Sequence, residues 1–282
     1  MRAPRVTTLR FQPVTACFGA TVAGIDLREE IGPDHACAVR EALDRFHVLI
    51  FPSQAIDDAA HLSLARVLGE PLVHPFERAM GRGESIHALV DRADRPPARP
   101  GWHTDDSYLA APPTYGLLRC EVAPSSGGHT LWADMTAAHE TLSPSLQTFL
   151  AELKGWHATS GALLDYVRAH LPPDRVAHVE EEVGEGASHP LVLTHPESGV
   201  RSIYFEPNFV TRIEGLSPAE SRFVCAFLTR LPNRVSLQIR HRWRPGDVVV
   251  WDERTTQHTG TADHAGQERI MRRCTVFGPR PR

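Results

Sequence analysis

Two spacings of hydrophobic residues divide the chain near Pro112. Before that point, segments of strand-like composition alternate with segments whose apolar residues recur at helical spacing, as in DHACAVREALDRFH. The apolar run VLIF (48–51) has the length of a short buried strand, and a second helical stretch follows Asp57. After Pro112, short strands joined by turns dominate, among them TYGLLRCEV, SSGGHTLWAD, VSLQIRHRW, DVVVWD and RIMRRCTVFG.

Two helices are expected to interrupt this strand-rich part of the chain. Ser143-Pro144 places a capping serine before a proline at the first helical turn, and Ser217 with Glu220 forms a capping box. Many short strands with a few helices predict a mainly β fold with peripheral helices, a sandwich or a barrel. We expect a single domain spanning residues 1–282.

Residues 160–190 differ from the rest of the chain. The stretch LPPDRVAHVEEEVGEGASHP is acidic and contains Pro and Gly, and we find little apolar periodicity after Tyr166. We interpret it as a mobile surface segment. A lid over a site and a solvated excursion remain open as alternatives.

Composition limits the kind of partner. The 30 Lys and Arg against 34 Asp and Glu give a formal charge of −4, so no basic field favours nucleic acid. The N-terminal sequence has no apolar core of a signal peptide, and no apolar run approaches the length of a membrane span. The five scattered cysteines are typical of free thiols in a reducing compartment. We therefore expect a cytoplasmic protein that binds neither membrane nor nucleic acid.

Candidate chemistry lies in the stretches GWHTDDSY and VVVWDERTTQHTG. Iron(II) oxygenases need two imidazoles and one carboxylate on one face of the metal, which leaves three positions open. The pair His103-x-Asp105 offers two such ligands, and His258 follows a very apolar strand and offers the third. From these residues alone, an ordinary polar turn and a structural histidine remain alternatives.

The last predicted strand carries arginines on an apolar face. Period-two alternation puts Arg269, Met271 and Arg273 on one side and Arg272 on the other. A buried guanidinium needs an anion, and its planar fork matches a carboxylate. A solvated face is the alternative, but the apolar segment CTVFG that follows argues against it.

With these motifs in order, the chain resembles the taurine dioxygenase / 2,4-dichlorophenoxyacetate dioxygenase family of iron(II)- and 2-oxoglutarate-dependent oxygenases. The resemblance covers nearly the whole chain. It implies a double-stranded β-helix, a cupin-like jelly roll, with iron at one open end. The matching segments are FGATVAGIDL, VLIFPSQ, GEPLVHP, WHTDDSY, GGHTLWADM, SGVRSIYFEPNFVTRIEGLSPAES and WDERTTQHTG with QERIMRRCTVFG.

The resemblance implies a role for each candidate. His103, Asp105 and His258 become the iron ligands, while Thr130 and Arg269 bind the distal carboxylate of 2-oxoglutarate. The implied cofactors are Fe(II), 2-oxoglutarate and O2. The implied reaction decarboxylates 2-oxoglutarate to succinate and CO2 and hydroxylates a C–H bond. Desaturation and cleavage of C–N, C–O or C–S bonds remain open, whereas the carboxylate at position 105 disfavours halogenation.

At the substrate end the resemblance implies a small acidic substrate: a carboxylate, a sulfonate or a sulfate. Arg273 matches the position that binds the anionic group, and His74, Tyr108 and Phe209 match further pocket positions. Asp106 departs from the taurine enzyme, which has valine there, so taurine itself is not expected. As a hypothesis, Asp106 and Arg273 together bind an amino-acid-like substrate; Asp106 facing solvent is the alternative.

Two other classes use the same residues. A zinc hydrolase takes similar ligands but leaves Thr130, Arg269 and Arg273 unexplained. A catalytically silent binding protein is disfavoured by the intact ligand set. Homo-oligomers are common in the family, and the sequence does not fix the oligomeric state.

Overall fold

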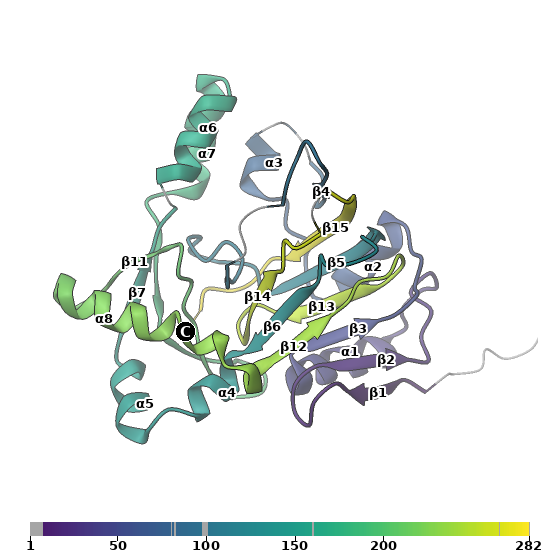
Figure 1. Cartoon of the computed structure of the whole chain (residues 1–282), viewed down its shortest axis with the longest axis horizontal. Coiled ribbons are helices and arrows are strands. Elements are labelled where there is room, and N and C mark those ends of the chain that lie inside the picture. The colour runs from purple at the N-terminus through teal and green to yellow at the C-terminus, as the bar shows by residue number, and fades with distance from the viewer. Residues whose placement is uncertain are drawn as a thin grey trace, which may run out of the picture.

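A seven-stranded sheet forms the larger layer of the fold (Figure 1). The computed structural model describes residues 8–79, 81, 83–97, 101–159, 161–264 and 266–281. In spatial order, the strands of this sheet are β1 (Arg10–Pro13), β2 (Ala20–Ala23), β3 (Val48–Phe51), β13 (Val248–Asp252), β5 (Tyr115–Val122), β15 (Arg269–Val276) and β4 (Ile86–Asp91). Only the pairing of β2 with β3 is parallel among the described strands.

A smaller three-stranded sheet packs against the large one. Its strands, in spatial order, are β12 (Gln238–His241), β6 (Thr130–Asp134) and β14 (Thr256–Gly260). The remaining strands form a sheet of β11 (Val210–Ile213), β7 (Lys154–His157) and β8 (Ala187–Pro190), and a pair of β9 (Val192–Thr194) with β10 (Arg201–Ile203).

The described helices lie outside these sheets (Figure 1). They are α1 (Pro33–Phe46), α2 (Asp58–Leu68), α3 (Pro75–Ala79), α4 (Met135–Glu140), α5 (Pro144–Ala151), α6 (Gly161–His170), α7 (Pro173–Val183) and α8 (Pro218–Leu228), with 3₁₀ turns at Leu231–Asn233 and Val235–Leu237. Both predicted caps are confirmed: Ser143 caps α5, and Ser217 forms a capping box with Glu220 at α8. No described helix combines the length and the apolar character that crossing a membrane requires.

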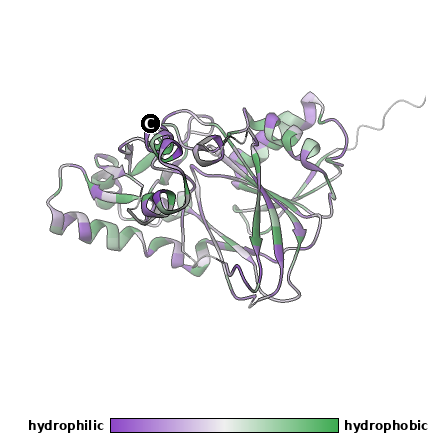
Figure 2. Ribbon diagram, turned by 90° about the horizontal axis from the view of Figure 1, so that it is seen from above, coloured by the Kyte–Doolittle hydropathy of each residue, from purple (hydrophilic) through white to green (hydrophobic). Residues whose placement is uncertain are grey.

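The neighbouring strands β3 (VLIF) and β13 (VVVWD) are almost entirely apolar, because both of their faces are covered. On β13, Val248 and Val250 belong to the core that includes α1 and α2. Val249 and Trp251 belong to the core between the two sheets, where Trp251 lies 5.8 Å from Trp132 of β6 between ring centroids. Side chains alternate across a strand, so a strand buried on both sides must be apolar at every position. Figure 2 shows these inner strands green through much of their length.

This arrangement of two facing sheets with peripheral helices confirms the predicted jelly-roll fold class. The five cysteines are free, as predicted.

Residues 161–190 form two helices and strand β8 rather than an irregular excursion. In α7, Val176, Val179 and Val183 recur at helical spacing, which was not recognised in the sequence. These valines pack with Val167 of α6 against Tyr108. The α6–α7 hairpin, which projects from the sheets in Figure 1, therefore backs one wall of the region around residue 108. Its motion as a lid stays a prediction.

His61 in α2 is a buried titratable group without polar contacts. It is 0% exposed, and neither ring nitrogen has a hydrogen-bond partner among the described residues. Burial, with the nearby charge of Arg119, lowers the pKa of His61 to about 3. The unfolded chain takes up this proton below about pH 6.5, but the folded chain does not. His61 therefore does not lower the free energy of unfolding above pH 6.5. Between pH 6.5 and pH 3 the free energy of unfolding falls, because only the unfolded chain binds this proton.

Between pH 7 and pH 5, the free energy of unfolding is expected to fall by about 2 kcal/mol less in His61→Leu than in the wild-type protein. The reason is that the unfolded variant has no imidazole at position 61 to bind the proton. Urea unfolding of both proteins at the two pH values measures this difference. Leu64→Ala, at a fully buried and non-titratable position of the same helix, is the control and should lower the stability by the same amount at both pH values. An unchanged stability loss in His61→Leu would contradict the assignment.

Candidate active site

A cavity of about 520 Å³ contains most of the candidate residues. Eight of the ten predicted site residues line it: His103, Asp105, Asp106, Thr130, Phe209, His258, Arg269 and Arg273. The other two, His74 and Tyr108, lie behind Asp106 and contact its carboxyl group.

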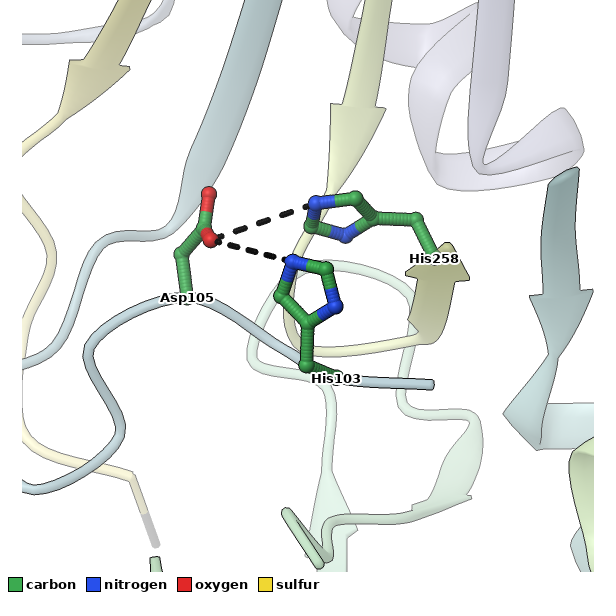
Figure 3. A group of neighbouring side chains, drawn as sticks. All are labelled: His103, Asp105 and His258. Carbon is green, nitrogen blue, oxygen red and sulfur yellow. Dashed lines mark ion pairs between the residues drawn. The ribbon is translucent and has the colours of Figure 1, made fainter. Parts of the chain in front are cut away.

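The potential metal ligands come from segments far apart in the chain (Figure 3). His103 and Asp105 lie on the loop after β4, and His258 lies on β14. Two backbone hydrogen bonds between residues 103 and 258, of 3.0 and 2.8 Å, join this loop to β14. Nε2 of His103 and Nε2 of His258 lie 3.8 and 3.9 Å from the same Asp105 oxygen. One ligand atom from each residue lies within 4.8 Å of the other two, so the three can share one ion.

The protonation states of these groups suit a divalent cation. The Nδ1 atom of His103 lies 2.8 Å from the carbonyl oxygen of Gly101, so Nδ1 is the donor and Nε2 is the nitrogen that faces Asp105. Burial, and then the neighbouring His103, lower the pKa of His258 well below its ordinary value, which keeps this imidazole neutral. Burial alone would raise the pKa of the Asp105 carboxyl, but Arg273, His258 and His103 outweigh it and lower that pKa. Neutral imidazole and ionised carboxylate are the forms that bind metal.

The two arginines of β15 point into the cavity with a buried methionine between them, as the alternation predicts. Met271 is 0% exposed, and Arg269 and Arg273 both line the cavity. Arg272 lies on the other face, with its Nε 3.0 Å from Glu121. Arg273 Nη2 forms an ion pair with Asp105 and lies 3.8 Å from Asp106. Its charge is therefore shared between two carboxylates.

Thr130 and Arg269 lie together at one end of the cavity, where a tight turn leads into β6. Gly127 and Gly128 have φ angles of 72° and 63°, a conformation in which a side chain is strained. A Cβ at Gly128 would also approach the Arg269 side chain to 3.2 Å. The glycine pair therefore brings the chain close to Arg269, whose Nε donates to the Gly128 carbonyl at 3.2 Å.

Three residues near Thr130 and Arg269 were not predicted from the sequence: Trp243, Asp91 and His264. The indole N–H of Trp243 donates to the Thr130 hydroxyl at 2.9 Å. Asp91 lies 3.6 Å from Arg269 Nη1 and 3.3 Å from His264 Nε2. These contacts join strands distant in the sequence, so no local motif indicated them.

Asp106 is buried in the cavity wall, so its predicted alternative, a position facing solvent, is wrong. It is 9% exposed, and its φ of 48° places it in the left-handed region. The Tyr108 hydroxyl donates to Oδ1 at 3.2 Å, and His74 Nε2 lies 3.3 Å from the same oxygen. The Tyr108 ring meets the edge of Phe209 at 4.9 Å between centroids.

Three further titratable residues surround the site. Burial raises the pKa of Glu206, a cavity residue, to about 7. Burial, and then the charge of Arg273, lower the pKa of His87 to about 4. Burial, and then Asp105, raise the pKa of Glu253 well above its ordinary value. Glu206 and Glu253 stand inside the recognised motifs YFEPNF and WDER, and their position in these motifs was the signal available in the sequence.

A second group of potential ligands is Asp44, His195 and Glu197. Two of its members are already paired with neighbouring side chains: His195 Nε2 lies 3.0 Å from Asp252, and Arg254 donates to Glu197 at 2.9 Å and to Asp252. This group is therefore an ion-pair network that braces the end of β13.

Comparison with known proteins agrees with this geometry. The family model described as "Taurine catabolism dioxygenase TauD, TfdA family" matches residues 10–275, and the chain belongs to this family. An alpha-ketoglutarate-dependent sulfate ester dioxygenase of Pseudomonas putida is 34% identical over 287 residues, covering 99% of this chain and 93% of that protein. The alpha-ketoglutarate-dependent 2,4-dichlorophenoxyacetate dioxygenase of Cupriavidus pinatubonensis is 31% identical, covering 94% of this chain and 96% of that protein.

Solved structures are similar over almost the whole chain. A taurine dioxygenase from Burkholderia xenovorans has a TM-score of 0.80 at 28% identity, covering 97% of this chain and 92% of that one. AAD-2 in complex with Mn(II) and N-oxalylglycine has a TM-score of 0.79 at 26% identity, covering 97% and 99%. The predicted class, a dioxygenase that uses Fe(II), 2-oxoglutarate and O2, is confirmed in preference to a zinc hydrolase or a silent binding protein.

Proposed function

We propose that this dioxygenase hydroxylates a C–H bond of a small acidic substrate held by Arg273 and converts 2-oxoglutarate to succinate and CO2. The observation that carries the proposal is the cavity itself, which combines the His103, Asp105 and His258 cluster with two inward arginines of one strand.

The three clustered residues would hold Fe(II), and their donor set of two imidazoles and one carboxylate fits that ion. The bound metal would supply the activation of O2. The protein's own contribution is to hold the ligands in their metal-binding forms, to orient both acids and to exclude water. Arg273 contributes to this by fixing the Asp105 carboxylate.

Thr130 and Arg269 would bind the distal carboxylate of 2-oxoglutarate. The Thr130 hydroxyl already accepts the N–H of Trp243, so its own hydrogen is free to point toward an incoming acid. Arg269 is largely buried, and among the described residues the only carboxylate paired with its guanidinium is that of Asp91, at 3.6 Å. A carboxylate entering here therefore meets a donor and an under-compensated positive charge.

At the substrate end we propose an acid that also carries an amine. The names of the two relatives above specify a sulfate ester and 2,4-dichlorophenoxyacetate, both of which are anionic and suit Arg273. In this chain Asp106 lies beside Arg273, and its buried Oδ2 has no hydrogen-bond partner among the described residues. An ammonium group would satisfy that oxygen, whereas an acid without a donor would leave it unsatisfied. That taurine itself is not the substrate stays a prediction, which rests on the departure of position 106 from the valine of the taurine enzyme.

The same site would also support desaturation or C–N, C–O or C–S cleavage, depending on which carbon of the substrate loses hydrogen. A cytoplasmic location, the absence of membrane and nucleic-acid partners, and homo-oligomer formation stay predictions.

The proposed cofactor site predicts a visible spectrum. Anaerobic protein with Fe(II) and 2-oxoglutarate is expected to show a weak metal-to-ligand charge-transfer band that disappears in His103→Ala. In Arg269→Leu, saturation of the band should require at least tenfold more 2-oxoglutarate, because a charge-assisted pair is lost. A band that persists at full strength in His103→Ala would contradict the ligand assignment. Zinc retention with O2-independent turnover would return the hydrolase to consideration.

Trp243→Phe is expected to weaken 2-oxoglutarate binding about fivefold, because one hydrogen bond that orients the Thr130 hydroxyl is lost. Titration of the Mn(II)-loaded protein with 2-oxoglutarate measures the dissociation constant, and Mn(II) affinity should not change. Thr130→Val should weaken 2-oxoglutarate binding by a smaller factor in the Trp243→Phe variant than in the wild-type protein. Fully additive effects would show that the two residues act independently.

Asp106→Ala is expected to reduce binding of 2-amino acids about tenfold or more, while the matching acids without the amino group bind unchanged or better. Perturbation of the charge-transfer band by each acid of a pair measures binding. Asp106→Asn, which keeps an oxygen for Tyr108 but removes the charge, is the matched control for shape. Equal losses for amine-bearing and amine-free acids would end the amino-acid hypothesis.

A further inference from the structure

The carboxyl group of Glu253 lies next to the proposed metal ligands and has no part in the function proposed above. Glu253 directly follows β13 and is 1% exposed. Its Oε1 accepts the indole N–H of Trp251 at 2.7 Å. Burying a carboxyl group this deeply is costly unless its oxygens are satisfied, so the group has a specific set of partners.

The other oxygen of Glu253 fastens the loop that carries His103 and Asp105. The backbone N–H of Asp105 donates to Oε2 at 3.1 Å, and the Thr104 hydroxyl lies 2.8 Å from it. The same hydroxyl lies 2.9 Å from the Glu253 carbonyl oxygen. The Glu253 side chain, just after β13 of the large sheet, thus fixes the main chain of Asp105. It thereby sets the point from which the Asp105 side chain extends.

Glu253 also faces the second nitrogen of His258. A metal-binding histidine normally donates its other ring N–H to an oxygen, which fixes the orientation of the ring. His103 has such an acceptor in the Gly101 carbonyl, at 2.8 Å. Nδ1 of His258 is buried and has no hydrogen-bond partner among the described residues, and Glu253 Oε2 lies 4.0 Å away.

We propose that Glu253 is a positioning residue of the metal centre: its Oε2 fixes the Asp105 main chain and is the acceptor toward which Nδ1 of His258, 4.0 Å away in this structure, turns when the ring binds metal. Two of the three proposed ligands then depend on a single carboxyl group that does not touch the metal. The inference rests on the ligand roles proposed above for His103, Asp105 and His258.

Mn(II) titration of the full-length protein tests this role without turnover. Glu253→Met, which fills a similar volume without oxygen acceptors, is expected to weaken Mn(II) binding about 10- to 100-fold. Glu253→Gln keeps one oxygen and is expected to weaken binding about threefold to tenfold, a partial rescue relative to Met. His103→Ala reports on the ligand set itself and should bind Mn(II) far more weakly than either.

A matched control separates metal positioning from general stability. Asp247 is also a buried carboxyl group at 2% exposure, and it accepts backbone N–H groups of Ser53 and Arg244 outside the cavity. Asp247→Asn should lower the urea midpoint but keep the wild-type Mn(II) affinity. A loss of Mn(II) affinity in Glu253→Met together with an unchanged affinity in Asp247→Asn is the result expected.

The possible outcomes are distinct. Wild-type Mn(II) affinity in both Glu253 variants, with affinity lost in His103→Ala, overturns the role of Glu253 and leaves the proposed ligand set intact. Wild-type affinity in His103→Ala overturns the ligand set and, with it, this inference. If Glu253→Met does not fold, Glu253→Gln decides alone, and a wild-type affinity there overturns the inference.

Discussion

The two backbone hydrogen bonds between His103 and His258 are the interaction on which the rest of the site depends. They join a loop that follows β4 to the edge of the smaller sheet, and they set the two imidazole rings 4.1 Å apart between centroids. Side chains can refine a metal site only after the main chain has brought the ligands together. Here a short antiparallel bridge between non-adjacent segments brings the candidate ligands together, and the jelly roll holds both of its ends in place.

The second constraint is charge. Arg273 lies between Asp105 and Asp106, while Asp91 lies between Arg269 and His264. Each arginine of β15 therefore has an acid of the protein beside it before any ligand arrives. An incoming acid has to compete with or add to these pairs, which makes the cavity selective by the balance of charges as well as by its shape.

Strand alternation was enough to predict the inward arginines, and the spacing of short strands predicted a mainly β fold. The jelly roll and the grouping of His103, Asp105 and His258 were predicted from the resemblance of the ordered motifs to the family, because residues 103 and 258 share no local motif. The α6–α7 hairpin was missed because three glutamates fill the turn between Val179 and Val183, so the acidic segment was interpreted as a solvated stretch. The pairs Trp243–Thr130 and Glu253–Asp105 were missed for a different reason. Both join segments more than a hundred residues apart, and only the packing of strands and loops in three dimensions brings such residues together.

The α6–α7 hairpin has a consequence for how this enzyme can change during evolution. The cluster of His103, Asp105 and His258 is attached to the sheets, whereas Tyr108 and Phe209 are backed by valines of a hairpin that lies outside them. Substitutions in α7 can therefore reshape the wall behind Asp106 while the sheets keep the cluster intact. The part of the pocket wall formed by Tyr108 and Phe209 can therefore change shape through the hairpin, without any substitution in the three clustered residues.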